Sequence, residues 1–119
     1  MKLILDETVF NDRLFVNYLL EKQIKTYLPA LAYLEYIRQH LKKGNTTSMV
    51  DAFLTELKVE VVPLSSEQAQ EAALMDEADY KTSTVAATSL LMKTILITQK
   101  PDTYPKLDQV KTPETLLKK

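Results

Sequence analysis

A carboxylate follows the first apolar segment of the chain, where it could bind a cation or move a proton. The segment Leu3–Leu5 is aliphatic, Asp6 comes directly after it, and Thr8 stands two residues later. A short apolar run bounded by polar residues is typical of a buried strand in an α/β sheet. Ligands of such sheets bind outside the carboxyl ends of the strands, where the strand order reverses. The sequence therefore predicts that Asp6 lies at the mouth of a site.

A second carboxylate, Glu35, lies on a predicted helix over residues 30–43, close to Leu34 and Ile37. A carboxylate in apolar surroundings must face either solvent or a cation, because burying it alone is costly. Two interpretations remain open. Glu35 either joins Asp6 in a site or marks the boundary of an amphipathic helix face.

The elements that must position these residues alternate between strands and helices. Strands are predicted over residues 2–6, 26–29, 59–64 and 94–98, with a short edge strand at 108–111. Helices are predicted over residues 9–22, 30–43, 49–57 and 67–77, from residue 82 or 83 to 92, and at the C-terminal end from residue 112. Strands that alternate with helices favour a mainly parallel sheet with right-handed crossovers.

Polar residues mark the expected helix starts. Thr8 is the predicted N-cap of the helix over 9–22, and Thr82 or Ser83 begins the helix that ends at 92. Ser65 and Gln68 have the spacing of a capping box, in which each side chain bonds the backbone of the other residue.

The composition excludes several classes of protein. At 119 residues, the chain is expected to form one domain over residues 1–119. A single glycine, Gly44, excludes glycine-rich phosphate loops. The absence of cysteine excludes thiolate metal sites and fits the reducing cytoplasm. Neither a signal peptide nor an apolar run of roughly 20 residues is present, so a cytoplasmic protein without membrane contact is expected. A net charge of -1 gives no global basic field for nucleic acid.

In their order along the chain, five motifs resemble those of the PIN domains, and in particular the VapC-type toxins, which are small metal-dependent ribonucleases. The resemblance covers nearly the full length. It rests on the segments Leu5-Asp6-x-Thr8, Leu31-Ala32-Tyr33-Leu34-Glu35, Val85-Ala86-Ala87-Thr88, Ile95-Leu96-Ile97-Thr98 and Val110-x-Thr112-Pro113.

The resemblance implies a three-layer α/β/α fold whose five-stranded, mainly parallel sheet has the order 3-2-1-4-5. It also implies an acidic pocket that binds Mg²⁺ or Mn²⁺ and positions water to cut single-stranded RNA. An antitoxin-like protein partner and a homodimer are further implications. Carboxylates suit this chemistry, because Mg²⁺ prefers oxygen ligands and activates a bound water.

Two of the four acids of the family's site are replaced in this sequence. The family's first acid corresponds to Asp6, the adjacent hydroxyl to Thr8 and the second acid to Glu35. The third acid position holds Thr82, and the fourth holds Lys100. The ammonium of Lys100 is expected to pair with Asp6 or Glu35 near the metal position, so that divalent cations bind weakly.

Three further acids could compensate for the missing ones. Asp79 lies one helical turn before Thr82, Asp102 lies two residues beyond Lys100, and Glu7 is next to Asp6. The alternative for Asp79 and Asp102 is that they cap helices or turns, which is a common role of Asp.

The remaining polar candidates have a weaker basis. The single histidine, His40, is expected at the surface. Some lysines could form a modest basic rim, and some tyrosines could stack on unpaired bases or lie half-buried. These residues are Lys22, Lys25, Lys42, Lys43, Tyr33, Tyr80 and Tyr104.

Three functions remain open at this point. The first is a toxin-like, Mg²⁺-dependent endoribonuclease that uses Asp6 and Glu35 as metal ligands and catalytic acids. The second is a non-catalytic module that binds RNA or an antitoxin-like protein, which the missing acids favour. The third is a signalling domain phosphorylated on Asp6, which ranks last because it leaves Glu35 without a role.

Overall fold

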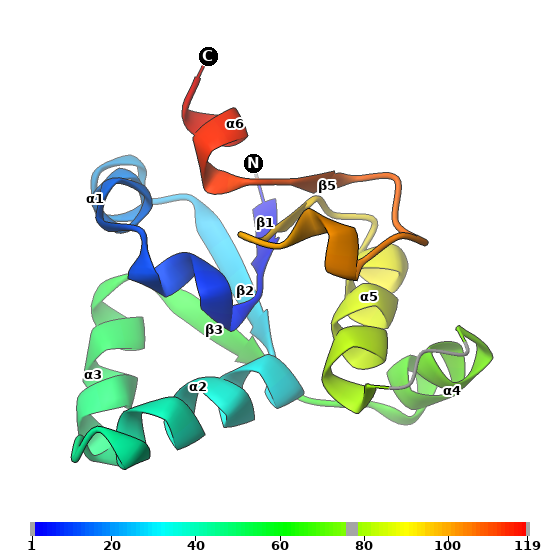
Figure 1. Ribbon diagram of the computed structural model, residues 1–119, viewed down its shortest axis with the longest axis horizontal. Coiled ribbons are helices and arrows are strands. Elements are labelled where there is room, and N and C mark those ends of the chain that lie inside the picture. Colours follow the sequence, from blue (N-terminus) through cyan, green and yellow to red (C-terminus); the bar gives the residue numbers. More distant parts are fainter. Residues whose placement is uncertain (1, 76–78, 119) are drawn as a thin grey trace.

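A five-stranded parallel sheet forms the centre of the computed structural model, which describes residues 2–75 and 79–118 (Figure 1). Its strands are β1 (Lys2–Leu5), β2 (Lys25–Pro29), β3 (Val59–Val62), β4 (Leu96–Ile97) and β5 (Val110–Lys111). The strand order is β3-β2-β1-β4-β5, and every neighbouring pair is parallel. The predicted α/β class and strand order are confirmed.

The helices cover the sheet from both sides. They are α1 (Arg13–Lys22), α2 (Ala30–Lys42), α3 (Thr47–Glu56), α4 (Ser66–Leu74), α5 (Tyr80–Met92) and α6 (Pro113–Leu117), with 3-10 helices η1 (Glu7–Asn11) and η2 (Pro101–Thr103). In Figure 1, α1 and α3 lie on one side of the strands and α4 and α5 on the other, while α2 runs below them. No helix in the described part of the chain is long and apolar enough to span a membrane.

The core surrounds the central strand β1. Leu3, Ile4 and Leu5 are fully buried, because helices cover both faces of the sheet. On α5, Val85 and Ala87 are also fully buried, and their small side chains let this helix pack closely. The polar residues that follow β1 are therefore held on a rigid base.

The single helix predicted over residues 9–22 is wrong. The chain instead forms η1 and then α1, and Asp12 separates them by acting as the N-cap of α1. Its carboxylate accepts a hydrogen bond of 3.1 Å from the backbone N–H of Phe15. The N-cap of η1 is Asp6 rather than Thr8, because the Asp6 carboxylate accepts from the backbone N–H of Thr8.

The helix predicted to start at Thr82 or Ser83 begins earlier, at Tyr80. Asp79 is its N-cap, and the Asp79 carboxylate accepts a hydrogen bond of 2.9 Å from the backbone N–H of Lys81. The first turn of α5 therefore carries Lys81 as well as Thr82. The predicted capping box of Ser65 and Gln68 is confirmed at the start of α4. Residues 76–78, where the predicted helix over 67–77 ends, lie outside the described residues.

Candidate functional site

Asp6 and Thr98 lie side by side at the carboxyl edge of the sheet. Asp6 directly follows β1, and Thr98 directly follows β4, the parallel neighbour of β1. The strand order reverses between these two strands, because β2 lies on the other side of β1. This reversal is where parallel α/β sheets bind their ligands. Asp6 therefore follows the central strand at the reversal of the strand order, as the sequence predicts, and its role in a site stays a prediction.

The carboxylate of Asp6 is buried and is surrounded by hydrogen-bond donors. Asp6 is only 2% exposed. Oδ1 accepts from the hydroxyl of Thr8 and, at 3.0 Å, from the backbone N–H of Thr8. Oδ2 accepts from the hydroxyls of Thr98 at 2.6 Å and Tyr104 at 3.0 Å. Four protein donors therefore satisfy both oxygens of this carboxylate.

The same hydroxyls hold the loop after β4 against the loop after β1. The backbone N–H of Gln99 donates to the Thr8 hydroxyl at 3.0 Å, and the backbone N–H of Lys100 donates to the Thr98 hydroxyl at 3.1 Å. Both threonines thus donate to Asp6. Thr8 accepts from the loop after β4, and Thr98 accepts from a residue of its own loop. Thr8 therefore contacts Asp6 directly, and its accessory role, which the family resemblance implies, stays a prediction.

Tyr104 is a site residue that the sequence did not identify. Of the two alternatives for this tyrosine, stacking on unpaired bases or burial, its exposure of only 3% favours burial. Burial raises the pKa of its phenol far above the usual value, and the charge of Asp6 and the hydrogen bond to Asp6 raise it further. The phenol therefore stays a hydrogen-bond donor to Asp6 over the physiological pH range.

Lys81 forms an ion pair with Glu7, the second acid after β1. Its ammonium lies 2.8 Å from Oε2 of Glu7, a residue that is only 4% exposed. Burial lowers the pKa of Lys81, but the hydrogen bond to Glu7 and the negative charges of Glu7, Asp6 and Asp79 outweigh it, so that the pKa is raised overall. Three carboxylates therefore act on one ammonium.

Raising the pH through the pKa of Lys81 is expected to reduce stability. Because folding raises this pKa above 10.5, the folded protein holds the proton more tightly than the unfolded chain. The protonated ammonium of Lys81 contributes its full stabilisation below the pKa that Lys81 has in the unfolded chain. This contribution is lost as the pH rises through the pKa that Lys81 has in the folded protein. Urea denaturation between about pH 8 and pH 11 should show a smaller loss for Lys81→Met than for the unmodified chain. Equal losses in both proteins would contradict this assignment.

A polar cavity of about 540 Å³ opens next to Glu7 and Thr8, which follow Asp6 in the chain. Loop and helix residues from both sides of the Asp6 network line it, namely Glu7, Thr8, Asn11, Asp12, Gln39, Gln99 and Lys100. We call it the site cavity. It is large enough to hold a small polar ligand.

Lys100 lines the site cavity, whereas Glu35 does not and is connected to it only through Gln39. Glu35 is half-buried on α2 and accepts a hydrogen bond of 3.3 Å from the side chain of Gln39, which lines the site cavity. Lys100 is exposed and lines the cavity, but within the described residues it forms no ion pair with Asp6 or Glu35. The expected ion pair of Lys100 is therefore absent there, and the pair between Lys81 and Glu7 is formed instead.

The remaining candidate positions, Thr82, Asp79 and Asp102, have structural roles or lie outside the site cavity. Thr82 is buried, and its hydroxyl donates at 3.1 Å to Asp79, whose carboxylate caps α5. Asp79 thus follows the capping alternative. Asp102 is exposed on η2 and does not line the site cavity.

Two of the weaker candidates form local contacts elsewhere. The ring nitrogen Nδ1 of His40 lies 2.8 Å from the side-chain nitrogen of Asn45. The hydroxyl of Tyr33 donates at 2.5 Å to Asp51, and this hydrogen bond raises the pKa of Tyr33. Neither residue lines the site cavity.

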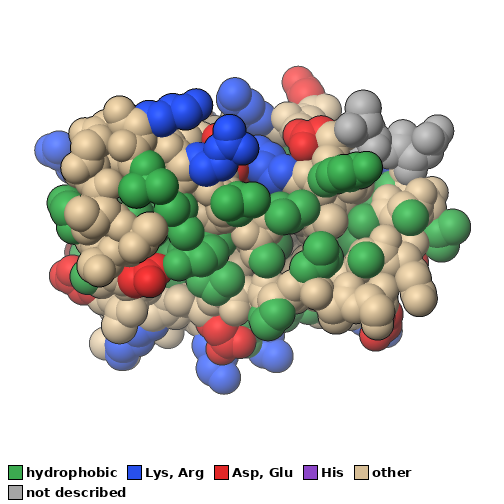
Figure 2. Space-filling model, turned by 90° about the horizontal axis from the view of Figure 1, so that it is seen from below, with side chains coloured by type: hydrophobic (Ala, Val, Ile, Leu, Met, Phe, Trp, Pro, Cys, Tyr) green, Lys and Arg blue, Asp and Glu red, His purple; other side chains and the backbone are tan. Residues whose placement is uncertain are grey.

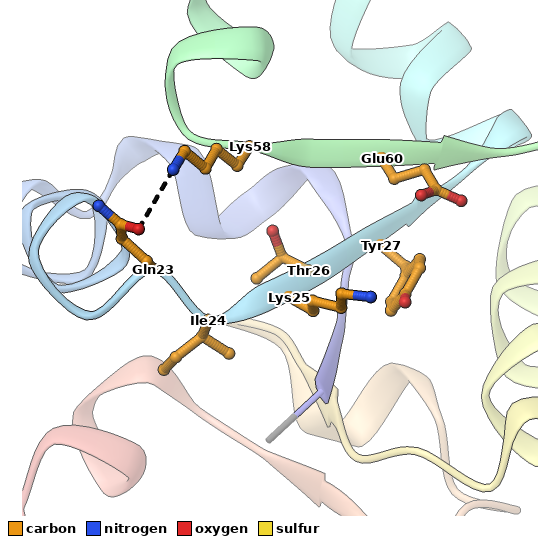
Figure 3. A pocket seen from close by; sticks show the side chains of 7 residues that line it. All are labelled: Gln23, Ile24, Lys25, Thr26, Tyr27, Lys58 and Glu60. Carbon is orange, nitrogen blue, oxygen red and sulfur yellow. Dashed lines mark hydrogen bonds between the residues drawn. The ribbon is translucent and has the colours of Figure 1, made fainter.

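A hollow of about 290 Å³ lies away from Asp6, around the amino-terminal ends of β2 and β3 (Figure 3). Its lining includes the side chains of Lys58 and Gln23, which bond to each other at 3.2 Å. Lys25 begins β2 and pairs in register with Lys2, at the end of β1 opposite to Asp6. This hollow is therefore separate from the candidate site.

The residues at the site, as arranged here, do not fit a divalent cation. Both oxygens of Asp6 already accept two hydrogen bonds each, and Glu7 is paired with the ammonium of Lys81. Within residues 2–75 and 79–118, no group of three or more His, Cys, Asp or Glu side chains lies close enough together to hold a metal ion. Magnesium sites need carboxylate oxygens that are free to face the ion or its waters. The roles of Asp6 and Glu35 as metal ligands stay a prediction.

Solved structures share the fold over almost the whole chain. A chain of VapBC-1 from nontypeable Haemophilus influenzae has a TM-score of 0.74 and 14% identity, covering 96% of this chain and 99% of that one. A chain of a toxin-antitoxin complex from Klebsiella pneumoniae has a TM-score of 0.73 and 16% identity, covering 92% and 96%. The PilT N-terminus domain protein SSO1118 from Sulfolobus solfataricus P2 has a TM-score of 0.66 and 18% identity, covering 98% and 91%.

Comparison with protein-family models and with curated proteins finds no match. The structural likeness nevertheless extends over nearly the full length of this chain and of each compared chain. The chain therefore has a VapC-like PIN fold.

Proposed function

We propose that this chain is a cytoplasmic PIN-fold module that binds an antitoxin-like protein and has little or no metal-dependent ribonuclease activity. The observation that carries the proposal is the state of the two acids after β1. Asp6 is saturated by four protein donors, and Glu7 is paired with Lys81. Metal-dependent hydrolysis requires an ion that activates water and stabilises charge on the phosphate. Thr82 and Lys100, at the other two acid positions, supply no carboxylate.

The partner surface that we propose is an apolar groove between α2, α4 and α5. The groove has a volume of about 380 Å³ and is lined by Leu31, Leu64, Ala69, Ala72, Ala73, Tyr80, Ser83 and Thr84. Apolar side chains gather across the face of the molecule seen from below (Figure 2). Tyr80, which lines the groove, is 80% exposed, and such exposed apolar surface is typical of interaction sites. The similar chain from Klebsiella pneumoniae comes from a toxin-antitoxin complex, which supports a protein partner of this kind.

The second candidate function is a Mg²⁺- or Mn²⁺-dependent endoribonuclease acting on single-stranded RNA. The site cavity favours it, since the cavity is polar, lies next to Asp6 and carries the cationic Lys100 on its rim. In this function Asp6 and Glu35 would be the metal ligands. A second copy of this chain is an alternative occupant of the apolar groove, and its binding there would form a homodimer.

A ribonuclease assay separates the two functions. The unmodified chain, Asp6→Asn and Glu35→Gln are incubated with unstructured RNA and Mg²⁺ or Mn²⁺, and Asp102→Asn serves as a control for loss of an exposed acid. We expect no cleavage, or an equal background in all four proteins that indicates contamination. Cleavage by the unmodified chain and by Asp102→Asn that vanishes in the other two variants would overturn the proposal.

A further inference from the structure

We infer that the ammonium of Lys81 is the resident cation of the acid site, in place of a divalent ion. The corollary is that removing this ammonium makes Glu7 a ligand for a divalent cation. The inference rests on the proposed function, because it explains how the site does without a metal. It concerns Lys81 and Glu7, which the sequence motifs of the site do not include.

The first support is the position of the ammonium. Lys81 projects from the first turn of α5 to Glu7 in η1, across 74 residues of sequence, and the two groups are 2.8 Å apart. The side chain of Lys81 is 24% exposed, so its charged end lies at the boundary between the buried acids and solvent. A cation that compensates the two buried acids would have to occupy this neighbourhood.

The second support is an unsatisfied oxygen. Oε1 of Glu7 is buried and has no hydrogen-bond partner within the described part of the chain. Buried polar atoms in proteins are nearly always bonded, so an orphan oxygen calls for a partner. The Lys81 ammonium satisfies only Oε2. Glu7 also lines the site cavity, which leaves room for an ion together with its waters.

The third support is the balance of charge. The negative charges of Glu7, Asp6 and Asp79 all raise the pKa of Lys81, which means that all three act on its ammonium. Without that ammonium, no other ion pair among residues 2–75 and 79–118 would involve the two buried acids. A hard cation such as Mn²⁺ prefers oxygen ligands and keeps several waters, so one free carboxylate and nearby negative charge can hold it.

The test uses Mn²⁺ as the probe, with electron paramagnetic resonance for binding and thermal denaturation for stability. Lys81→Met should bind Mn²⁺ at least about tenfold more tightly than the unmodified chain, and Mn²⁺ should raise its melting temperature. Lys81→Arg keeps the charge and should gain no affinity. Lys100→Met removes a neighbouring charge from the same cavity and should also gain none. The double variant Lys81→Met with Glu7→Gln should lose the gained affinity.

Three outcomes would overturn the inference. These are Mn²⁺ binding by Lys81→Met that is no tighter than in the unmodified chain, an equal gain of affinity in Lys100→Met, and a gain that survives Glu7→Gln. If Lys81→Met does not fold in metal-free buffer, circular dichroism after refolding with Mn²⁺ becomes the readout. Recovered helix supports the inference, and its absence overturns it. Failure of the proposed function is a separate result, because it would appear as metal-dependent RNA cleavage by the unmodified chain.

Discussion

Replacing Asp6 by alanine is expected to lower the free energy of unfolding by about 3–5 kcal/mol, because it leaves buried donors unpaired. The hydroxyls of Thr98 and Tyr104 and the backbone N–H of Thr8 would each lose their acceptor. Each unpaired buried group costs about 1–3 kcal/mol, and partial access of Thr8 to solvent reduces the sum. A loss of this size is a large part of the total stability of an ordinary domain.

Asp6→Asn is the matched control. It keeps the shape of the side chain and one carbonyl acceptor, and the two hydroxyls can turn to accept from its amide group. The expected loss is about 1–2 kcal/mol. Urea denaturation in the presence of a chelator measures both variants.

The sign of these changes distinguishes the two functions. Acids gathered to hold a metal repel one another when the metal is absent, so removing one of them stabilises the metal-free protein. In this chain Asp6 is held by protein donors, and its removal should destabilise. A gain in stability on Asp6→Asn would contradict the proposed arrangement.

Replacing Lys81 by methionine is expected to cost about 3–5 kcal/mol, because it leaves a buried carboxylate without its counter-ion. Glu7 is only 4% exposed, and among the described residues its Oε1 has no hydrogen-bond partner, so solvent compensates poorly for the lost ammonium. Methionine preserves most of the apolar stem of lysine, so the loss measures the missing charge.

Replacing Glu7, the other member of the ion pair, should lower the free energy of unfolding much less. Glu7→Gln removes the buried charge, and the side chain of Lys81, which is partly exposed, can reach solvent. The expected loss is about 1 kcal/mol or less. Lys118→Met, which breaks an exposed pair of 3.4 Å with Glu114, is the control and should change stability by no more than about 0.5 kcal/mol. Equal losses for Lys81→Met and Glu7→Gln, measured by urea denaturation, would contradict the assignment of Glu7 as the buried member.

The sheet could be predicted because its signals are local. The aliphatic run Leu3–Leu5 and the segment Val59–Val62 identify strands by composition alone. The order of the strands came from a family resemblance, and the structure confirms it. The placement of Asp6 followed from the rule that ligands bind where the strand order reverses.

The helix starts were predicted less well, because a short polar side chain can override an apolar pattern. The apolar periodicity continues past Asp12, yet its carboxylate bonds the backbone of Phe15 and starts a new helix. Likewise, Asp79 is the N-cap of α5, so the helix begins at Tyr80, two residues before the hydroxyl-rich segment that starts at Thr82. That shift places Lys81 within the first helical turn.

Two partners of the acids, Tyr104 and Lys81, could not be predicted, because they come from distant parts of the chain. Tyr104 is 98 residues from Asp6, and it follows a 3-10 turn that begins at Pro101. Lys81 is 74 residues from Glu7. Neither tyrosine nor lysine at these positions belongs to a local motif, so only the folded structure reveals these contacts.

The most direct test of the account is a titration of the unmodified chain with Mn²⁺, followed by electron paramagnetic resonance. Because Asp6 is saturated by protein donors and Glu7 is paired with Lys81, we expect no saturable binding at micromolar Mn²⁺. Tight, saturable binding that disappears in Asp6→Asn would contradict the account and identify a working metal site.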